Sequence, residues 1–315
     1  MKCMNRYQEI AREETPPHVV TIGNFDGVHV GHRALLGAAR CRADSLGISL
    51  AVLTFEPHPA EILKPETEKL RLVTPERKRE LLSECGVELA LFQAFDAEFA
   101  ALSAEAFARA VLVDALRARL VYVGENFRFG KGREAGVGTL SKFGRRFGFD
   151  VYSAELIQRG ETAVSSSRIR EALTRGDVAA AAKMLGRYHE VSGTVSRDRQ
   201  LGKKMGFPTI NLKNVTVMFP KPGIYAALAD VGGRTVSAAA YIGDRPTMGS
   251  GFSIEAHLLD FGGDLYEESA TLRFVARIRD DEKFDTTDQL TRQIAADIAE
   301  IRGILASANI TEIHD

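Results

Sequence analysis

The first 185 residues alternate between short apolar runs and segments in which apolar residues recur at helical spacing. A run that is apolar on both faces is typical of a strand buried inside a parallel sheet. Helices between such runs supply the crossovers that parallel strands need. We therefore expect an α/β domain with a parallel sheet, with strands at Val19–Gly23, Ser49–Phe55, Val87–Phe92, Leu120–Gly124 and Phe149–Leu156.

Capping residues set the expected bounds of the helices. Serine, threonine and aspartate side chains accept the free N–H groups of a first turn, and glycine ends a helix in the left-handed conformation. The first helix is expected over about Arg33–Ser45, with Gly47 as its C-cap and an apolar face made of Leu35, Ala38, Ala39 and Leu46. Further helices are expected from Thr74 to Gly86, from Ser103 to Leu116, around Leu140–Arg146 and from Asp177 to Gly186. The Val164–Arg170 segment is expected to lead into another helix, which ends at Gly176.

After Gly186 the pattern changes to strands joined by glycine turns. Alternation at Tyr188–Ser196 predicts the first strand, and the other strands are expected as two hairpins. Several hairpins in succession favour a closed antiparallel barrel. A final apolar stripe of Leu290, Ile294, Ile298, Ile301 and Leu305 predicts a helix from Thr287 that packs across the barrel. The expected hairpins are Ile224–Ala229 with Thr235–Ile242, and Ile254–Phe261 with Glu268–Ile278 across Gly262-Gly263.

Length and composition agree with two domains, expected at 1–185 and 186–315. The chain has 315 residues, 45% of them apolar, which is enough for two cores. A net charge of −1 gives no general attraction to nucleic acid or to an anionic membrane. Three scattered cysteines argue against a disulfide framework and suit a reducing cytoplasm. We expect no membrane span, because no apolar run is long enough, and no secretory signal, because Met1–Pro17 is too polar.

The junction after the first predicted strand carries the strongest local signal for chemistry. The strand ends at Gly23, the chain turns through Asn24, and His29 and His32 open the next helix. Phosphates bind at such a junction because the first N–H groups of a helix lack acceptors and the helix dipole adds positive potential. Imidazoles can add donors beside the same phosphates, while Gly31 lets a ligand approach the backbone. An ordinary turn with two solvated histidines is the alternative from these residues alone.

Three loops with unusual composition follow the first, second and fourth predicted strands, at Asn24–His32, Glu56–Pro59 and Glu125–Arg133. The carboxyl ends of parallel strands meet at one edge of a sheet, where ligands bind. The basic and aromatic Glu125–Arg133 loop fits a mononucleotide better than nucleic acid, because no wider basic field surrounds it. Ser165, Ser166 and Arg170 open a later helix as a second anion-binding terminus, or as an ordinary N-cap with surface arginines.

The second part of the chain carries its own candidate chemistry. Thr209 and Asn211 are two residues apart, so on a strand their side chains share a face, where a hydroxyl and an amide oxygen suit Mg²⁺. A proline-initiated turn with an Asx hydrogen bond is the alternative. Glu255 shares a face with His257, opposite the apolar neighbours Ile254, Ala256 and Leu258. Its carboxylate suits a general base, and cross-strand charge pairing is the alternative.

Six segments in this order resemble the bifunctional riboflavin kinase/FAD synthetase family of bacteria over nearly the whole chain. The segments are Gly23-Asn-Phe-Asp-Gly-Val-His-Val-Gly-His32, Thr54-Phe-Glu-Pro-His-Pro59, Gly124-Glu-Asn-Phe-Arg-Phe-Gly130, Val164-Ser-Ser-Ser-Arg-Ile-Arg170, Gly206-Phe-Pro-Thr-Ile-Asn211 and Arg279–Phe284. The resemblance implies a Rossmann-like nucleotidyltransferase domain and a riboflavin kinase-like barrel. The barrel domain would phosphorylate riboflavin with ATP to give FMN, and the first domain would join FMN to AMP from a second ATP, giving FAD and pyrophosphate.

The resemblance also implies a role for each candidate residue. ATP and its phosphates would be bound by Gly23, Asn24, His29, His32, Asn126, Ser165, Ser166 and Arg170, with His29 and His32 stabilising the departing pyrophosphate. His58 and Arg279 would bind flavin, Thr209 and Asn211 would bind Mg²⁺ with ATP, and Glu255 would take the proton from the ribityl hydroxyl. The expected partners are riboflavin, FMN and ATP, without nucleic acid or membrane, and self-association is left open.

Departures from the family pattern gather in the second domain. Ile210 stands where alanine is usual, Tyr241 where asparagine is common, and Glu267 where glycine is common. Gly186-Arg-Tyr-His189 replaces Gly-Arg-Pro-Tyr, and Ser167 replaces threonine. Two alternatives therefore stay open beside a bifunctional enzyme: an adenylyltransferase with a weakened or lost kinase, and a non-catalytic regulator that binds flavin or nucleotide.

Overall fold

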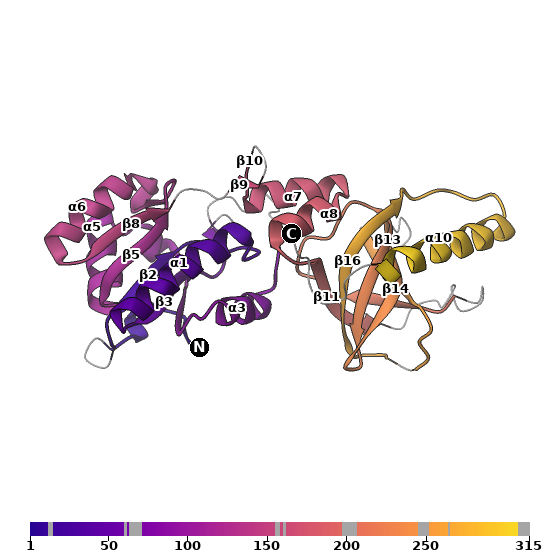
Figure 1. Ribbon diagram of the computed structural model, residues 1–315, viewed down its shortest axis with the longest axis horizontal. Helices are drawn as coiled ribbons and strands as arrows, with labels where there is room; N and C mark the ends of the chain where they lie inside the picture. The colour runs from indigo at the N-terminus through magenta and orange to yellow at the C-terminus, as the bar shows by residue number, and fades with distance from the viewer. Residues whose placement is uncertain are drawn as a thin grey trace. The chain divides into compact units, whose positions relative to one another are not determined.

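The computed structural model describes residues 1–11, 15–59, 62, 71–154, 158–159, 162–196, 207–244, 252–263 and 265–307 (Figure 1). The chain forms two compact units. The first unit contains residues 1–69 and 74–164, and the second contains residues 70–73 and 165–315. Gly206 of the Gly206–Asn211 segment, and the last two residues of the strand expected at Phe149–Leu156, lie outside the described residues.

A parallel sheet is the centre of the first unit, as predicted. Its order is β1-β4-β3-β2-β5-β8, and every neighbouring pair is parallel. β2 therefore lies between β3 and β5, where the strand order reverses. The short edge strand β1 was not predicted, because its three residues form no apolar run and only their pairing with β4 makes them a strand. The strands are β1 (Lys2–Met4), β2 (His18–Ile22), β3 (Ser49–Phe55), β4 (Leu89–Gln93), β5 (Ala118–Gly124) and β8 (Asp150–Ala154).

The helices of the first unit begin at the predicted caps. Thr74 and Ser103 accept backbone N–H groups of the first turns of α3 and α5, and Gly47 ends α1 in the left-handed conformation. The predicted apolar face of α1 is wrong, because Leu36, Ala39 and Ala43 are buried whereas Leu46 is 45% exposed. The buried face is rotated about the helix axis relative to the predicted one. The helices are α1 (Val30–Leu46), α3 (Pro75–Glu84), α4 (Ala97–Ala100), α5 (Ala104–Phe107) with a π-helical continuation (Ala108–Ala115), and α6 (Val137–Phe147). Shorter elements are η1 (Tyr7–Glu9), η4 (Lys131–Arg133), and the two-residue strands β6 (Arg128–Phe129), β7 (Ala135–Gly136), β9 (Gln158–Arg159) and β10 (Thr162–Ala163).

The second unit is built on a closed barrel in the order β11-β12-β15-β14-β13-β16, with all pairs antiparallel. The predicted β13–β14 hairpin is confirmed. The predicted hairpin of β15 with β16 is wrong, because β15 pairs with β12 and β14 whereas β16 closes the barrel between β11 and β13. A glycine pair marks a change of direction but does not specify the next partner. The strands are β11 (His189–Ser196), β12 (Thr209–Lys213), β13 (Gly223–Val231), β14 (Arg234–Asp244), β15 (Phe252–Leu258) and β16 (Ser269–Arg279).

Two helices that precede the barrel share its core. α7 (Ser166–Arg175) and α8 (Val178–Leu185) bury Ile169, Leu173 and Leu185 in one cluster with the apolar interior of the barrel. The change of pattern near Leu185 thus marks the end of the helices, whereas the contacts divide the chain between residues 164 and 165. Arg71 also joins this unit, since its carbonyl accepts the Met218 N–H at 2.8 Å.

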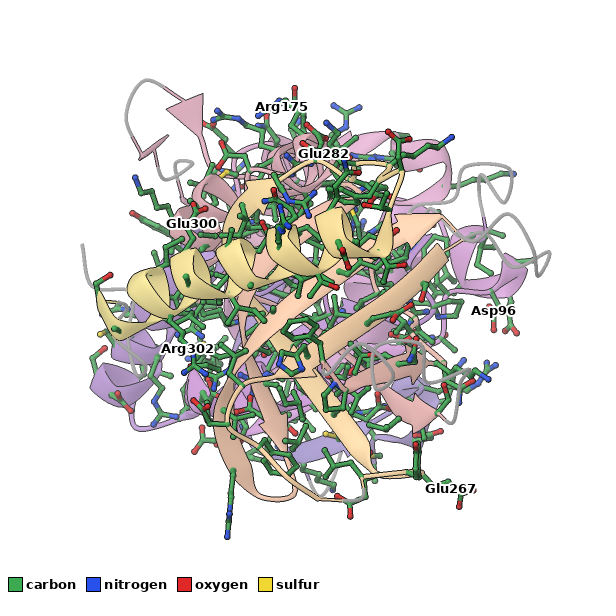
Figure 2. The ribbon with its side chains drawn as sticks, turned by 90° about the vertical axis from the view of Figure 1, so that its right-hand side faces the viewer. Asp96, Arg175, Glu267, Glu282, Glu300 and Arg302 are labelled. Carbon is green, nitrogen blue, oxygen red and sulfur yellow. The ribbon has the colours of Figure 1, made fainter. Side chains whose placement is uncertain are left out.

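The last helix, α10 (Thr287–Ser307), lies across the outer face of the barrel, as Figure 2 shows. Ile301 and Leu305 pack there against Leu228 and Val275, which confirms the helix expected from the apolar stripe. Asp297 of α10 is buried and accepts from Arg279 Nη2 at 2.8 Å. Among the described residues, no helix is long and apolar enough to cross a bilayer.

Candidate active sites

The three loops predicted to share a rim follow β2, β3 and β5, which are adjacent parallel strands. Their carboxyl ends therefore lie at the same edge of the sheet. The strand order also reverses beside β2, so this edge contains the crevice where open α/β sheets bind ligands. The sequence prediction of a single rim is confirmed by this topology.

The turn after β2 is fixed by strong local contacts. Thr54 Oγ1, on β3, donates to the carbonyl of Asn24 at 3.0 Å, and the Gly23 N–H donates to Leu53 at 3.1 Å. Phe25 is fully buried with a φ of 48°, and Val28 is fully buried with a φ of 38°. Such backbone angles are unfavourable for these side chains and persist only where the surroundings fix them. The turn is thus a rigid frame for the residues that follow it.

His29 and His32 meet at the start of α1. His29 is the N-cap, and its Nδ1 accepts the His32 backbone N–H at 3.3 Å. The two imidazole rings stack with centroids 3.6 Å apart, and Phe25 contacts His32 edge-on at 5.1 Å. A Cβ on Gly31 would lie 3.2 Å from the His29 ring, so the glycine makes room for this imidazole. The His-x-Gly-His pattern therefore builds a stacked pair at a helix N-terminus.

The His32 ring is held in its neutral form. Its Nδ1 is buried and has no hydrogen-bond partner within the described residues. Burial lowers the pKa of His32 well below its usual value, and the charges of His29 and Lys78 lower this pKa further. Neutral imidazole carries one N–H and one free nitrogen. An anionic ligand beside the ring would favour its charged form and so oppose the effect of burial.

Lys78 is a residue of this site that the sequence analysis missed. It is 6% exposed on α3, its Nζ lies 5.8 Å from the centre of the Phe92 ring, and its charge acts on His32. A signal for it existed, because Lys78, Leu81 and Leu82 occupy one buried helix face. A lysine at an apolar position of an amphipathic helix indicates a specific use of its charge.

The other predicted nucleotide residues are placed as follows. His58 is half-buried after β3, Asn126 is exposed after β5, and Asn24 is exposed after β2. Ser165 is the N-cap of α7, its Oγ accepting the Arg168 N–H at 3.4 Å, and Ser166 opens the helix in the second unit.

The predicted residues of the barrel share one face of two paired strands. Asn211 on β12 lies directly opposite Glu255 on β15. Thr209 Oγ1 donates to Glu255 Oε2 at 3.4 Å, and Ser253 Oγ donates to Glu255 Oε1 at 3.1 Å. Ile254 and Ala256 point the other way, into the buried interior. The structure therefore brings Thr209, Asn211 and Glu255 together and adds Ser253 as a second hydroxyl that positions the carboxylate.

Arg279, the predicted flavin residue, is at the end of β16 in a buried ion pair. Its Nε and Nη2 donate to Asp297 at 3.0 and 2.8 Å, and its Nη1 donates to the Asp280 carbonyl at 3.0 Å. Hydrogen bonds to Asp297 raise the pKa of this guanidinium. Its charge therefore anchors α10 and the chain after β16.

The structure describes the surroundings of three departures from the expected pattern, and two of them are accommodated by packing or by a hydrogen bond. Ile210 is partly buried and packs against the core of the barrel. His189 is 1% exposed, and its Nε2–H donates to the Met218 carbonyl at 2.6 Å. Glu267 has a φ of 65°, a conformation that glycine adopts more easily. Figure 2 shows Glu267 at the opposite end of the barrel from Glu282.

Comparison with known families agrees with this division into two sites. The FAD synthetase family model matches residues 11–168, and the riboflavin kinase family model matches residues 185–305. The bifunctional riboflavin kinase/FMN adenylyltransferase of Escherichia coli K12 is 37% identical over 94% of this chain and 96% of its own length.

The chain belongs to the bifunctional riboflavin kinase/FMN adenylyltransferase family.

Other comparisons support this membership. The family member from Pseudomonas fluorescens is 37% identical over 91% of this chain and 93% of its own length. A crystal structure of a protein named macrolide-efflux protein from Streptococcus pneumoniae aligns with a TM-score of 0.87 and 29% identity, over 95% of this chain and 98% of that one. His29 and His32 lie within the range of the FAD synthetase match, and Glu255 lies within the range of the riboflavin kinase match.

Proposed function

We propose that this chain is a bifunctional enzyme that converts riboflavin to FMN with one ATP and FMN to FAD with another. The observation that carries the proposal is that both family models match one chain, each over a unit with its own polar site. The second unit transfers a terminal phosphoryl group, and the first transfers AMP and releases pyrophosphate.

In the first unit, the FMN phosphate attacks the α-phosphorus of ATP and pyrophosphate leaves. No protein nucleophile is needed, so the rate comes from positioning and from stabilisation of charge. His29 and His32 bind the ATP phosphates at the start of α1, where the helix dipole favours negative charge. The N–H of the neutral His32 ring can donate to the phosphate oxygens, whose negative charge grows as the pyrophosphate departs. The charge of Lys78, which acts on His32, adds positive potential at this site.

The remaining residues of the adenylyl transfer are proposed from the sequence. Gly23 and Asn24 form the turn beside the histidines, Asn126 binds the nucleotide, and His58 lies at the flavin end of the rim. Ser165, Ser166 and Arg170 bind the phosphate tail. Ser165 and Ser166 stand at the N-terminus of α7, which supports this role because that position suits an anion, and Arg170 lies about one turn further along the helix.

In the second unit, Glu255 removes the proton from the ribityl hydroxyl of riboflavin as this hydroxyl attacks the γ-phosphate of ATP. Two hydroxyl donors hold the carboxylate in its orientation. The hydroxyl of Thr209 and the amide oxygen of Asn211 fit Mg²⁺, a hard cation that prefers oxygen ligands. When bound with ATP, Mg²⁺ neutralises charge on the phosphates. Arg279 contributes at the flavin end by fixing the chain after β16.

The test is turnover followed by separation of flavins. The protein is incubated with ATP and Mg²⁺ and either riboflavin or FMN, and the products are separated by chromatography. Formation of FAD from riboflavin supports the proposal. Product from FMN alone would show an adenylyltransferase without kinase activity, and no product from either flavin would refute enzymatic function. We further propose a cytoplasmic location, because the three scattered cysteines suit a reducing compartment. Self-association is measured by light scattering.

A further inference from the structure

One long-range hydrogen bond ties the chain after β16 to the polar face of the barrel. Tyr241 Oη donates to Asp281 Oδ2 at 2.9 Å, across 40 residues of sequence. Tyr241 is on β14 directly opposite Glu255 on β15. Residues that lie opposite each other on antiparallel strands have side chains on the same face. The phenol therefore rises from the same face as the proposed general base.

The tyrosine side chain lies along its own strand. A Cβ on Gly243 would overlap the Tyr241 hydroxyl, and residues two apart on a strand share a face. Ser253 pairs with Gly243 on the neighbouring strand, and Ser253 also donates to Glu255. Only glycine at 243 leaves room for the phenol in this position. The missing side chain at Gly243 thus leaves the space through which the Tyr241 hydroxyl extends to Asp281.

The residues beside Asp281 are fixed from other directions. Asp280 accepts from Arg277 Nη2 at 2.8 Å and from Lys221 Nζ at 2.9 Å, and these bonds lower its pKa to about 2. Arg279 is bound to Asp297 of α10. These bonds hold Asp280 to Arg277 and Lys221, and they hold Arg279 to α10. The Tyr241 bond holds the same stretch of chain from the face of the barrel that carries Glu255. A substrate that reacts at Glu255 must fit beside the segment that Tyr241 holds.

We infer that Tyr241 is a positioning residue for riboflavin, which fixes the Asp280–Phe284 segment beside Glu255 so that the ribityl hydroxyl meets the carboxylate. This inference rests on the proposed kinase function. Asparagine is common at this position in the resembling family. Its side chain is shorter than that of tyrosine and has no phenol, so it does not make this bond to Asp281. The tyrosine is a feature of this chain that tightens its flavin site. Tyr241 acts through Asp281 and takes no part in the proton transfer.

Steady-state kinetics of the kinase reaction test the inference. Tyr241→Phe removes one hydrogen bond to a carboxylate, so the KM for riboflavin should rise about fivefold to tenfold. The kcat should stay within about twofold, because Glu255 and its two hydroxyl donors are intact. Tyr241→Asn should resemble Tyr241→Phe. Conversion of FMN to FAD by the same variants should be unchanged. The retained kcat for riboflavin phosphorylation reports that the barrel itself is folded.

The partner residue supplies the second arm. Asp281→Ala should raise the KM for riboflavin to the same extent, and the double variant with Tyr241→Phe should be no worse than either single variant. Asp281→Asn keeps an acceptor oxygen and should restore most of the affinity. Tyr152→Phe, which removes an exposed phenol from β8 in the first unit, is the matched control.

The outcomes separate this inference from the proposed function. If the unaltered protein makes no FMN from riboflavin, the proposed kinase function fails. If it makes FMN and Tyr241→Phe leaves the KM for riboflavin unchanged, the inference is wrong and the function stands. A fall in kcat with an unchanged KM, or additive effects in the double variant, would also overturn it.

Discussion

Replacing Glu255 by glutamine is the sharpest test of the proposed kinase chemistry. The carboxylate accepts from Ser253 Oγ at 3.1 Å and from Thr209 Oγ1 at 3.4 Å. Glutamine keeps the size of the side chain, its amide oxygen can still accept from Ser253, and the Thr209 hydroxyl can rotate to accept from its NH₂ group. The substitution therefore removes the basic oxygen and leaves the local structure in place.

The expected loss follows from the role of a general base. Such a group contributes about 10²-fold to 10⁴-fold in rate, or roughly 3–5 kcal/mol of barrier. Riboflavin phosphorylation by Glu255→Gln should fall within this range, with the loss in kcat. The conversion of FMN to FAD should persist, because Glu255 is not among the residues proposed for that reaction.

The assay measures both reactions on the same preparation by chromatography of the flavins. Glu268→Gln is the matched control, since this glutamate is exposed at the start of β16 and away from Glu255. A Glu255→Gln variant with at least a tenth of the normal kinase rate would refute the general-base role. Loss of both activities in a folded variant would refute separate sites.

Three further predictions concern the first site and the stability of the barrel. His32→Ala should lower FAD formation by about 10²-fold to 10³-fold while riboflavin phosphorylation continues, since a donor to the phosphates is lost; equal loss of both rates would contradict this. Burial lowers the pKa of His189 to about 4, so the unfolded chain binds a proton near pH 6.5 that the folded chain takes up only near pH 4. The free energy of unfolding should therefore fall by about 2 kcal/mol between pH 7 and pH 5, and His189→Gln should flatten this slope in urea titrations. Asp297→Ala strands Arg279, whose side chain is 16% exposed, and should lower the free energy of unfolding by about 3 kcal/mol, whereas Asp297→Asn should lose less; urea midpoints without that difference would show that the pair adds nothing.

Local signals in the sequence determined most of the elements of this protein. The cap residues Thr74, Ser103 and Asp177 start helices where predicted, because an N-cap bond involves only a few neighbouring residues. Apolar runs determined the buried strands, since a strand covered on both faces must be apolar throughout. Six motifs in order were enough to indicate the family, and the alternation around Glu255 placed it correctly opposite the core.

Only the tertiary structure decided which distant residues meet. The partner of β15, the docking of α7 and α8 on the barrel and the edge strand β1 depend on packing and pairing between segments far apart in the chain. The same holds for the bond from Tyr241 to Asp281 and for the charge of Lys78 near His32. Sequence periodicity shows which face of an element is buried but does not show what covers it, because many partners can satisfy the same apolar face.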